Sequence, residues 1–286
     1  MKHYLSYFYI LLAGSLWGVI GLFNRNLSAG GFSPYSIVFV RNIGSLIVLG
    51  LIFLIFDRSI FQIKPKHLPY FLGTGIVSIL FFTLCYFSCQ QICSLATAAI
   101  LLYTAPTFVV ILSSILWKDK ITKQKIFALV IAFLGCTFVT GIWSGNLSIS
   151  ALGLLLGVGS GFFYGLYSIF ARCALKYYQP LTVTFYTFLF AGIGSLILIR
   201  PPELKIGFSQ FQMISLIIGL IVVSTVLPYI LYTKGLSMTD SGKASILASI
   251  EPVIAAAVGI LAFGEPASIT VLLGLVCILI SVYILR

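Results

Sequence analysis

The sequence predicts an all-α membrane protein with ten transmembrane helices, arranged as two inverted five-helix repeats. Three observations predict this fold: an apolar composition, basic residues concentrated in alternate loops, and an internal repeat. Of the 286 residues, 60% are hydrophobic and 8% are charged, with a mean hydropathy of +1.14. Soluble domains carry about 25% charged residues, because their surfaces face water. We therefore expect a lipid bilayer to surround this chain.

Apolar runs separated by turn residues and charges define the spans. A bilayer core about 30 Å thick needs roughly 20 apolar residues per helix. Runs of this kind lie near residues 4–23, 34–56, 68–88, 95–117, 124–143, 151–170, 180–199, 210–233, 243–263 and 268–285. The first run is longer than the apolar core of a signal peptide, and no small-residue cleavage site follows it. We therefore expect it to remain as the first span.

The loops alternate between basic and nearly neutral. If the N-terminus is cytoplasmic, thirteen of the 17 Lys and Arg residues fall on the cytoplasmic side. They are Lys2, Arg58, Lys64, Lys66, Lys118, Lys120, Lys123, Lys125, Arg172, Lys176, Lys234, Lys243 and Arg286. Because cytoplasmic loops are enriched in Lys and Arg, we expect both termini in the cytoplasm of a cell-membrane protein. The net charge of +11 is spread over short loops, which argues against a nucleic-acid partner.

The two halves of the chain resemble each other. A shift of 146 residues places Pro106 on Pro252, so that ATAAILLYTAPTFVVILSSILWKD overlies GKASILASIEPVIAAAVGILAFGE. We therefore assign residues 1–146 and 147–286 to two repeats. Since each repeat holds an odd number of spans, the second enters the membrane from the opposite side. Inverted repeats are typical of secondary transporters that work by alternating access.

Further matches lie at the ends of the repeated segments. At a shift of 146, Asp119 coincides with Glu265, and we expect both acids to be solvated residues at span ends. A shift of 147 near the start of each half aligns WG with YG and FNR with FAR, at Trp17, Tyr164, Arg25 and Arg172. These matches indicate that the chain arose by duplication.

A glycine at every fourth position marks the sixth span. These residues are Gly153, Gly157, Gly161 and Gly165. Small residues at this spacing allow a second helix to approach closely in lipid. We expect them to serve packing rather than substrate binding.

Pro106 and Pro252 stand at equivalent positions in the fourth and ninth spans. Each proline lacks a backbone donor and so interrupts its helix. Matched helix breaks in inverted repeats indicate a transport site or a hinge, although kinks that only shape packing are an alternative. Pro228 in the eighth span is a third candidate hinge and has no counterpart in the third span.

Two charged residues fall inside spans, Arg41 in the second and Glu251 in the ninth. Charges in lipid are costly and by default indicate a functional site. At 1.5 Å per residue, the two lie on the order of 8 Å apart along the membrane normal. One hypothesis is that Glu251 binds an ammonium group or a proton, and Arg41 binds the carboxylate of an amino-acid-like substrate. The alternatives are an ion pair between the two, or an Arg41 that caps backbone carbonyls.

Proton binding at Glu251 is part of the same hypothesis. Burial disfavours the charged form of a carboxyl group. A proton and a cationic substrate would then compete for Glu251, and the competition would give antiport.

Five aromatic residues are candidates for substrate contact, because repeat symmetry or proximity to Pro106 distinguishes them. They are Trp17, Tyr86, Tyr103, Tyr164 and Tyr232. Trp17 matches Tyr164, and Tyr86 matches Tyr232. Tyr103 lies about one turn before Pro106.

Several of these segments resemble the EamA family of the drug/metabolite transporter superfamily. They are LWG in the first span, TAPTFVVILSSILWKDKIT at the fourth and EPVIAAAVGILAFGEP at the ninth. The resemblance covers essentially the whole chain. It implies ten helices with both termini inside, a central cavity lined by spans one, three, four, six, eight and nine, and transport of amino acids or related metabolites, most often as efflux. Asp119 stands where the family usually has glutamate, and arginine in the second span is common there.

The residues needed for enzymatic chemistry are missing. The six acidic residues are scattered, and His3 and His67 lie near span ends. No G-x-S-x-G, H-E-x-x-H or P-loop pattern appears. Cys85, Cys89 and Cys93 share a helix face, but without further ligands nearby they are better explained as small apolar residues than as a metal site. We therefore expect neither enzymatic activity nor a cofactor.

Other transport functions stay open. Multidrug efflux of lipophilic cations would use Glu251 with aromatic residues and leave Arg41 structural. An exchanger or uptake carrier for another metabolite would share the architecture, whereas a passive channel would show neither saturation nor counterflow. The expected partners are a small-molecule substrate, H⁺ and the lipid bilayer, and the protein is expected to be a monomer or homodimer.

Overall fold

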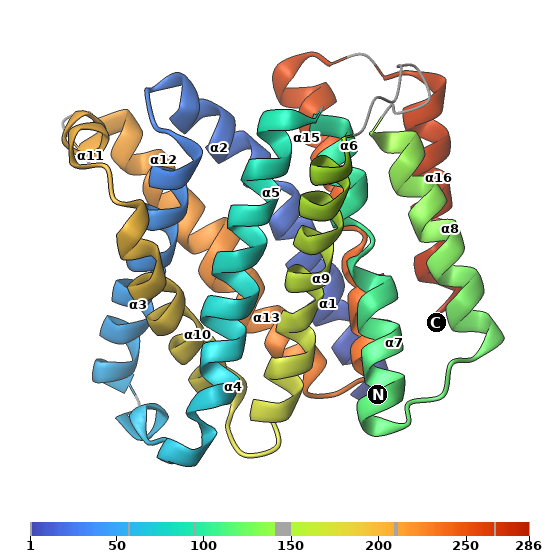
Figure 1. Cartoon of the computed structure of the whole chain (residues 1–286), viewed down its shortest axis with the longest axis horizontal. Coiled ribbons are helices and arrows are strands. Elements are labelled where there is room, and N and C mark those ends of the chain that lie inside the picture. Colours follow the sequence, from blue (N-terminus) through green and yellow to red (C-terminus); the bar gives the residue numbers. More distant parts are fainter. Residues whose placement is uncertain are drawn as a thin grey trace.

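The computed structural model describes residues 2–56, 58–93, 95–140, 150–208, 211–265 and 267–285. Within these ranges the chain is a bundle of helices and contains no β-strand (Figure 1). The all-α fold class is thereby confirmed. The expected boundary between the repeats, at residues 146 and 147, lies outside the described residues, as does the expected end of the fifth span at residue 143.

The helices follow one another with short connections. The first half contains α1 (Lys2–Gly18), α2 (Ile20–Ala29), α3 (Pro34–Phe56), α4 (Leu68–Leu72), α5 (Phe81–Ile92), α6 (Leu95–Leu102), α7 (Ala105–Trp117) and α8 (Lys123–Val139). The second half contains α9 (Ala151–Ala174), α10 (Pro180–Ser195), α11 (Pro201–Phe208), α12 (Phe211–Ile221), α13 (Leu227–Leu236), α14 (Ser241–Ala248), α15 (Glu251–Phe263) and α16 (Ile269–Ile284).

Eight helical stretches within the described residues are long and apolar enough to cross a membrane. They are Tyr4–Ala29, Pro34–Ile55, Pro65–Ile92, Thr97–Trp117, Ala151–Ala174, Pro180–Leu198, Phe211–Leu236 and Ser241–Phe263. Ile269–Ile284 is a shorter apolar helix, and α8 begins with two lysines in its first turn. The protein is therefore a multi-pass membrane protein, while the count of ten spans remains a prediction.

Polar side chains cap the start of several helices. Each accepts a hydrogen bond from the backbone N–H three residues later, which satisfies a donor that has no partner inside the helix. The capping residues are Thr122, Ser150, Asp240 and Ser268, at the starts of α8, α9, α14 and α16.

Two helices are interrupted at equivalent places. α6 ends at Leu102 and α7 begins at Ala105, while α14 ends at Ala248 and α15 begins at Glu251. All four ends of α6 and α7 are shifted by 146 residues from those of α14 and α15. Each second helix carries a proline in its first turn, where the missing N–H costs no hydrogen bond. Each also ends before a left-handed residue, Lys118 or Gly264.

Two π-helical segments form a second matched feature. Gly73–Leu80 joins α4 to α5, and Val222–Val226 joins α12 to α13. A shift of 146 residues places the first segment on residues 219–226, so the two overlap. π-Helical turns widen a helix and are frequent at functional sites. Pro228 lies two residues after the end of the second segment, whereas Phe82 stands at the matching position after the first.

Glycines bring a helix of each half onto the helix break of the other. A Cβ atom on Gly161 of α9 would lie 2.5 Å from Thr104 Oγ1, between α6 and α7. A Cβ atom on Gly18 of α1 would lie 2.6 Å from the backbone oxygen of Glu251. The expected packing role of the glycines in the sixth span is therefore confirmed at this crossing.

The two broken helices run in opposite directions. In Figure 1, α7 ends near the lower edge of the bundle and α15 ends near its upper edge. α8 packs against α16 at one side of the bundle. The largest cluster of buried apolar side chains includes residues of α1, α9, α10 and α13, and it positions the walls of the site described next.

Candidate substrate-binding site

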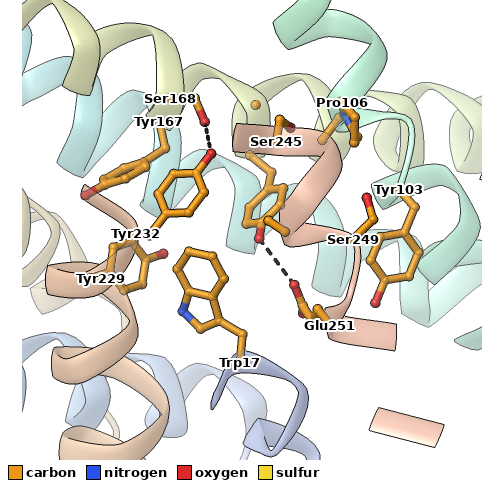
Figure 2. A pocket seen from close by; sticks show the side chains of 14 residues that line it. Trp17, Tyr103, Pro106, Tyr167, Ser168, Tyr229, Tyr232, Ser245, Ser249 and Glu251 are labelled. Atoms are coloured by element: carbon orange, nitrogen blue, oxygen red, sulfur yellow. Dashed lines mark hydrogen bonds between the residues drawn. The ribbon is translucent and has the colours of Figure 1, made fainter. Parts of the chain in front are cut away.

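A cavity lies in the bundle beside both helix breaks (Figure 2). It holds about 490 Å³ of empty space, its open mouth included. The lining residues are Trp17, Tyr103, Ala105, Pro106, Tyr164, Gly165, Tyr167, Ser168, Tyr229, Tyr232, Ser245, Ala248, Ser249 and Glu251. Aromatic rings and hydroxyl groups therefore form most of the wall, with one carboxyl group among them.

Glu251 is the first residue of α15, and the interruption of the helix directs its side chain into the cavity. Its Oε2 atom accepts a hydrogen bond of 3.3 Å from the hydroxyl of Tyr164. The first turn of a helix has free N–H groups and a partial positive charge, which favour a carboxylate at this position. The helix break thus holds a single acidic group at the edge of an aromatic cavity.

Four aromatic rings form the opposite wall. The ring centroids of Trp17 and Tyr229 are 5.1 Å apart, and those of Trp17 and Tyr232 are 5.2 Å apart. Tyr167 contacts Tyr229 at 5.1 Å. Rings packed in this way hold one another in place, and their faces attract cations.

Hydroxyl groups fix the orientation of two of these rings. The Tyr232 hydroxyl lies 2.7 Å from Ser168 Oγ, and the Tyr167 hydroxyl lies 2.7 Å from Thr233 Oγ1. Figure 2 shows Tyr232 between Ser168 and Trp17. A substrate therefore meets a preformed wall.

The two interhelical linkers face the same cavity. Tyr103 belongs to the linker between α6 and α7, and Ser249 belongs to the linker between α14 and α15. These residues are equivalent at a shift of 146, as are Ala105 and Glu251. Both breaks thus contribute to the lining, but only the second contributes an acid.

The structure brings together five of the predicted binding residues and separates two. Tyr86 is outside the lining. Its ring centroid lies 6.0 Å from that of Phe82, which in turn lies 5.2 Å from that of Tyr164. Among the predicted hinge residues, Pro106 lines the cavity, whereas Pro252 and Pro228 do not. The residues that do line it are Glu251, Trp17, Tyr103, Tyr164 and Tyr232.

Arg41 also lies outside the lining, on α3. No hydrogen bond or ion pair joins it to Glu251 in the described part of the chain. Its guanidinium group lies within electrostatic range of Tyr229 and Tyr164, which belong to the cavity wall. Arg41 therefore lies near this wall without lining the cavity.

Sequence reasoning missed several lining residues. Tyr167 and Ser168 lie three and four residues after Tyr164, and Tyr229 lies three residues before Tyr232. Residues at these spacings share a helix face. Ser245 of α14 and Ser249, directly after this helix, are likewise four residues apart. Helical spacing from the predicted residues is the signal that would have found them.

Matched ion pairs lie at the two ends of the bundle. Arg172 of α9 binds both carboxylate oxygens of Asp119, and its guanidinium carbon lies 4.3 Å from the ring centroid of Trp117. Asp119 is only 15% exposed, so the expectation that it is solvated was wrong. The expectation failed because Arg172 comes from the other half of the chain.

The cluster at the other end of the bundle likewise joins an arginine to an acidic residue and an aromatic ring. Arg25 of α2 pairs with Glu265 at 2.9 Å and lies 4.2 Å from the ring centroid of Phe263. These residues match Arg172, Asp119 and Trp117 at shifts of 146 or 147 residues. The Arg25 and Glu265 side chains are 58% and 54% exposed, whereas the first pair is mostly buried.

A membrane-spanning helical bundle around a polar and aromatic cavity is the architecture of a transport protein. The EamA-like transporter family model matches residues 4–141 and 151–286, so the chain belongs to this family and is not expected to be an enzyme. An uncharacterized transporter of Archaeoglobus fulgidus is 31% identical over 277 residues, covering 96% of this chain and 94% of that protein.

Other relatives carry names of the same kind. The uncharacterized inner membrane transporter YicL of Salmonella typhimurium is 27% identical, covering 96% of this chain and 93% of that protein. The uncharacterized transporter YyaM of Bacillus subtilis is 25% identical, covering 99% and 93%. A solved crystal structure matches with a TM-score of 0.82 and 15% identity, covering 98% of this chain and 95% of that one. This last likeness supports the fold alone.

Proposed function

We propose that this protein is a secondary active carrier that moves amino acids or related small metabolites across the cytoplasmic membrane, as proton-coupled efflux by alternating access. The observation that carries the proposal is the position of Glu251, a single carboxyl group at a helix break that faces an aromatic cavity. The substrate is a small molecule, and the carrier works in a lipid bilayer as a monomer or homodimer.

Glu251 binds the ammonium group of the substrate or, in its absence, a proton. The carboxylate already accepts a hydrogen bond from Tyr164, and its remaining lone pairs can accept donors from a ligand. The faces of Trp17 and Tyr232 stabilise a cation in the same space. Because one carboxylate serves both ligands, binding of substrate releases a proton, and the two move in opposite directions.

Arg41 binds the carboxylate of the substrate in this proposal. It lies near Tyr164 and Tyr229 without lining the cavity, so a carboxylate in the cavity reaches it only when these residues move. Binding at both ends would then couple substrate recognition to the conformational change. Tyr86 belongs to the same moving region, next to Phe82 and Tyr164.

The alternating-access part of the proposal treats residues 1–146 and 147–286 as inverted repeats with five spans each and both termini in the cytoplasm. The matched helix breaks, the matched π-helical segments and the opposite directions of α7 and α15 support it. Pro106, Pro252 and Pro228 stand where the helices depart from regular geometry and serve as hinges.

The two ion-pair clusters act as latches for the two ends of the bundle. The pair between Arg172 and Asp119 is shielded, and that between Arg25 and Glu265 is open to its surroundings. In an inverted-repeat carrier, equivalent features of the two halves exchange their environments when access switches. The unequal exposure of the two clusters supports a state in which the end of the bundle with Arg172 and Asp119 is closed and the end with Arg25 and Glu265 is opening.

Efflux of lipophilic cations is the second candidate function. The absence of Arg41 from the cavity lining favours it, because a substrate without a carboxylate needs only Glu251 and the aromatic wall. An exchanger for another metabolite would retain counterflow, and a passive channel would lose it.

Counterflow in proteoliposomes tests the proposal. Vesicles containing the protein are loaded with single amino acids or a lipophilic cation, and uptake of labelled substrate is followed together with internal pH. We expect saturable counterflow with an amino acid, reduced roughly tenfold to a hundredfold by Glu251→Gln and by Arg41→Ala, because each change removes a bond to a charged group. Glu203→Gln, an acid outside the cavity, is the control.

The outcomes separate the candidates. The second function is supported if Glu251→Gln loses counterflow of a lipophilic cation while Arg41→Ala keeps it. Undiminished and still pH-dependent transport by both variants would remove the proposed role of both residues. Flux without counterflow would identify a channel.

A further inference from the structure

A second group of buried polar side chains lies between α3 and the helix formed by α12 and α13. Asn42, Ser45 and Ser224 are at most 1% exposed. Within the described ranges, both side-chain polar atoms of Asn42, the hydroxyls of Ser45 and Ser224, and Nε and Nη2 of Arg41 have no hydrogen-bond partner. None of these residues lines the aromatic cavity.

These residues belong to one place in the fold. Arg41, Asn42 and Ser45 fall within about 100° of one another around α3, because residues one and four positions apart on a helix share a side. α3 packs against α12 and against the π-helical segment Val222–Val226, which contains Ser224. Ile221 directly precedes this segment and contacts α3 at Gly44.

Buried polar groups in native proteins are almost always hydrogen-bonded, because a buried donor or acceptor without a partner loses its bonds to water and gains none in return. Four unsatisfied side chains at one place therefore indicate that something else supplies their partners. The group consists mainly of donors: a guanidinium, an amide and two hydroxyls. It carries one positive charge, and no acidic residue of the described chain forms an ion pair with Arg41. This chemistry suits an anion and not a cation.

The equivalent place in the other half shows that the fold itself does not need the polar side chains of Asn42 and Ser45. At a shift of 146, Arg41 corresponds to Thr187, whose hydroxyl bonds to Val183 O and Thr74 Oγ1. Asn42 and Ser45 correspond to Phe188 and Ala191, which belong to the apolar core. The first half thus carries polar groups where packing is satisfied by apolar ones.

We propose that Arg41, Asn42, Ser45 and Ser224 form a buried anion-binding site. The anion is either a small inorganic ion such as chloride or the carboxylate of the transported substrate. Only the second case rests on the proposed function, because an inorganic ion needs neither Glu251 nor the aromatic cavity. In both cases Asn42 and the two hydroxyls donate to the anion beside the guanidinium group.

The experiment measures the melting temperature of the purified full-length protein as chloride or acetate replaces gluconate at constant ionic strength. Acetate stands for a substrate carboxylate, and gluconate is too large for a site between packed helices. We expect a saturable rise with at least one of the two small anions, because a ligand that binds only the folded state stabilises it. Chloride alone identifies an inorganic occupant, and a response to acetate identifies a carboxylate site.

The double variant Ser45→Ala/Ser224→Ala tests the residues. It should raise the half-saturating anion concentration roughly tenfold, because it removes two donors to a charged ligand. In gluconate it should melt no lower than the wild type, since it removes two unsatisfied hydroxyls. Ser195→Ala/Ser281→Ala is the matched control, because these buried hydroxyls bond to backbone oxygens of their own helices.

Two results would overturn the proposal: no saturable response to either anion, which means that only water fills the site, or an unchanged half-saturating concentration in the double variant. Glu251→Gln should leave the response to chloride and acetate unchanged. Failure of the proposed role of Glu251 is therefore distinguishable from failure of the anion site.

Discussion

The two helix breaks share their helix boundaries, but only one of them carries a charged residue. α6 and α7 are separated in the same way as α14 and α15, and each break is crossed by glycines from the other half. The residue that begins the second helix is Ala105 in one break and Glu251 in the other. Backbone geometry is therefore shared, whereas charge is not. The difference indicates that the breaks are a requirement of the fold and the carboxyl group is an addition for function.

Adding a methyl group to the glycines that pack against the helix breaks should have the largest effect on stability, and it should do so in both halves. Gly161→Ala and Gly18→Ala place a Cβ atom within 2.6 Å of the opposite helix break, so we expect losses of about 1–3 kcal/mol and reduced yields of folded protein. Gly159→Ala and Gly21→Ala are matched controls in α9 and α2, where the added atom meets nothing closer than 3.8 Å. Melting temperatures in detergent compare the variants with their controls. Equal melting temperatures would refute the close packing of Gly161 and Gly18 against the helix breaks.

A carboxyl group should support transport only at the second break. We expect Glu251→Ala to abolish transport, and Ala105→Glu on that background not to restore it, because the partner that orients Glu251 is Tyr164. Counterflow in proteoliposomes measures both. Recovery of at least half of the wild-type rate in the double variant would show that the two breaks are interchangeable, which contradicts the account.

The ion-pair clusters offer a second comparison between the halves. Asp119→Asn should destabilise the protein by about 2 kcal/mol, because it leaves Arg172 partly buried without its bidentate partner. Glu265→Gln should cost about 0–1 kcal/mol, since its pair with Arg25 is exposed. Thermal unfolding at low and high salt should show this order, with the second effect vanishing in salt. The opposite order would mean that the Arg25 pair, and not the Arg172 pair, holds its end of the bundle closed.

Another small effect concerns Glu203, which lies outside the spans. Burial raises the pKa of its carboxyl group, but hydrogen bonds from Ser33 and Ser36 and the charge of Arg200 outweigh burial, so the pKa falls below its usual 4.5. A lowered carboxyl pKa contributes stability above the unfolded-state value that is lost as the pH falls. We expect Glu203→Gln to cost about 1 kcal/mol at pH 7 and nothing at low pH. A pH-independent difference in melting temperature would contradict this assignment.

Much of the fold could be predicted because lipid imposes simple constraints. Apolar runs located the eight helical stretches of the described residues that can cross a membrane. Pro106 and Pro252 located the breaks, since a proline cannot continue the hydrogen-bond pattern of a helix. The π-helical segments could not be predicted. Their sequences are apolar, and the widened turn depends on neighbouring helices.

The candidate site could be predicted in part. A single acid in an apolar run indicated Glu251, and the structure places this residue in the cavity. Tyr86 does not line the cavity, although repeat symmetry matches it with Tyr232, which does. The pairing of Asp119 with Arg172 depends on a contact between halves that a linear pattern does not contain.

Proton release on substrate binding is the most direct test of the central claim. The purified protein is mixed with a transported amino acid in weakly buffered solution, and the proton released per bound substrate is measured with a pH dye. The account predicts release that tends toward one proton in the wild type and in Glu203→Gln, and none in Glu251→Gln at substrate concentrations that still saturate it. Equal proton release by Glu251→Gln and the wild type would contradict the claim that substrate and proton share Glu251.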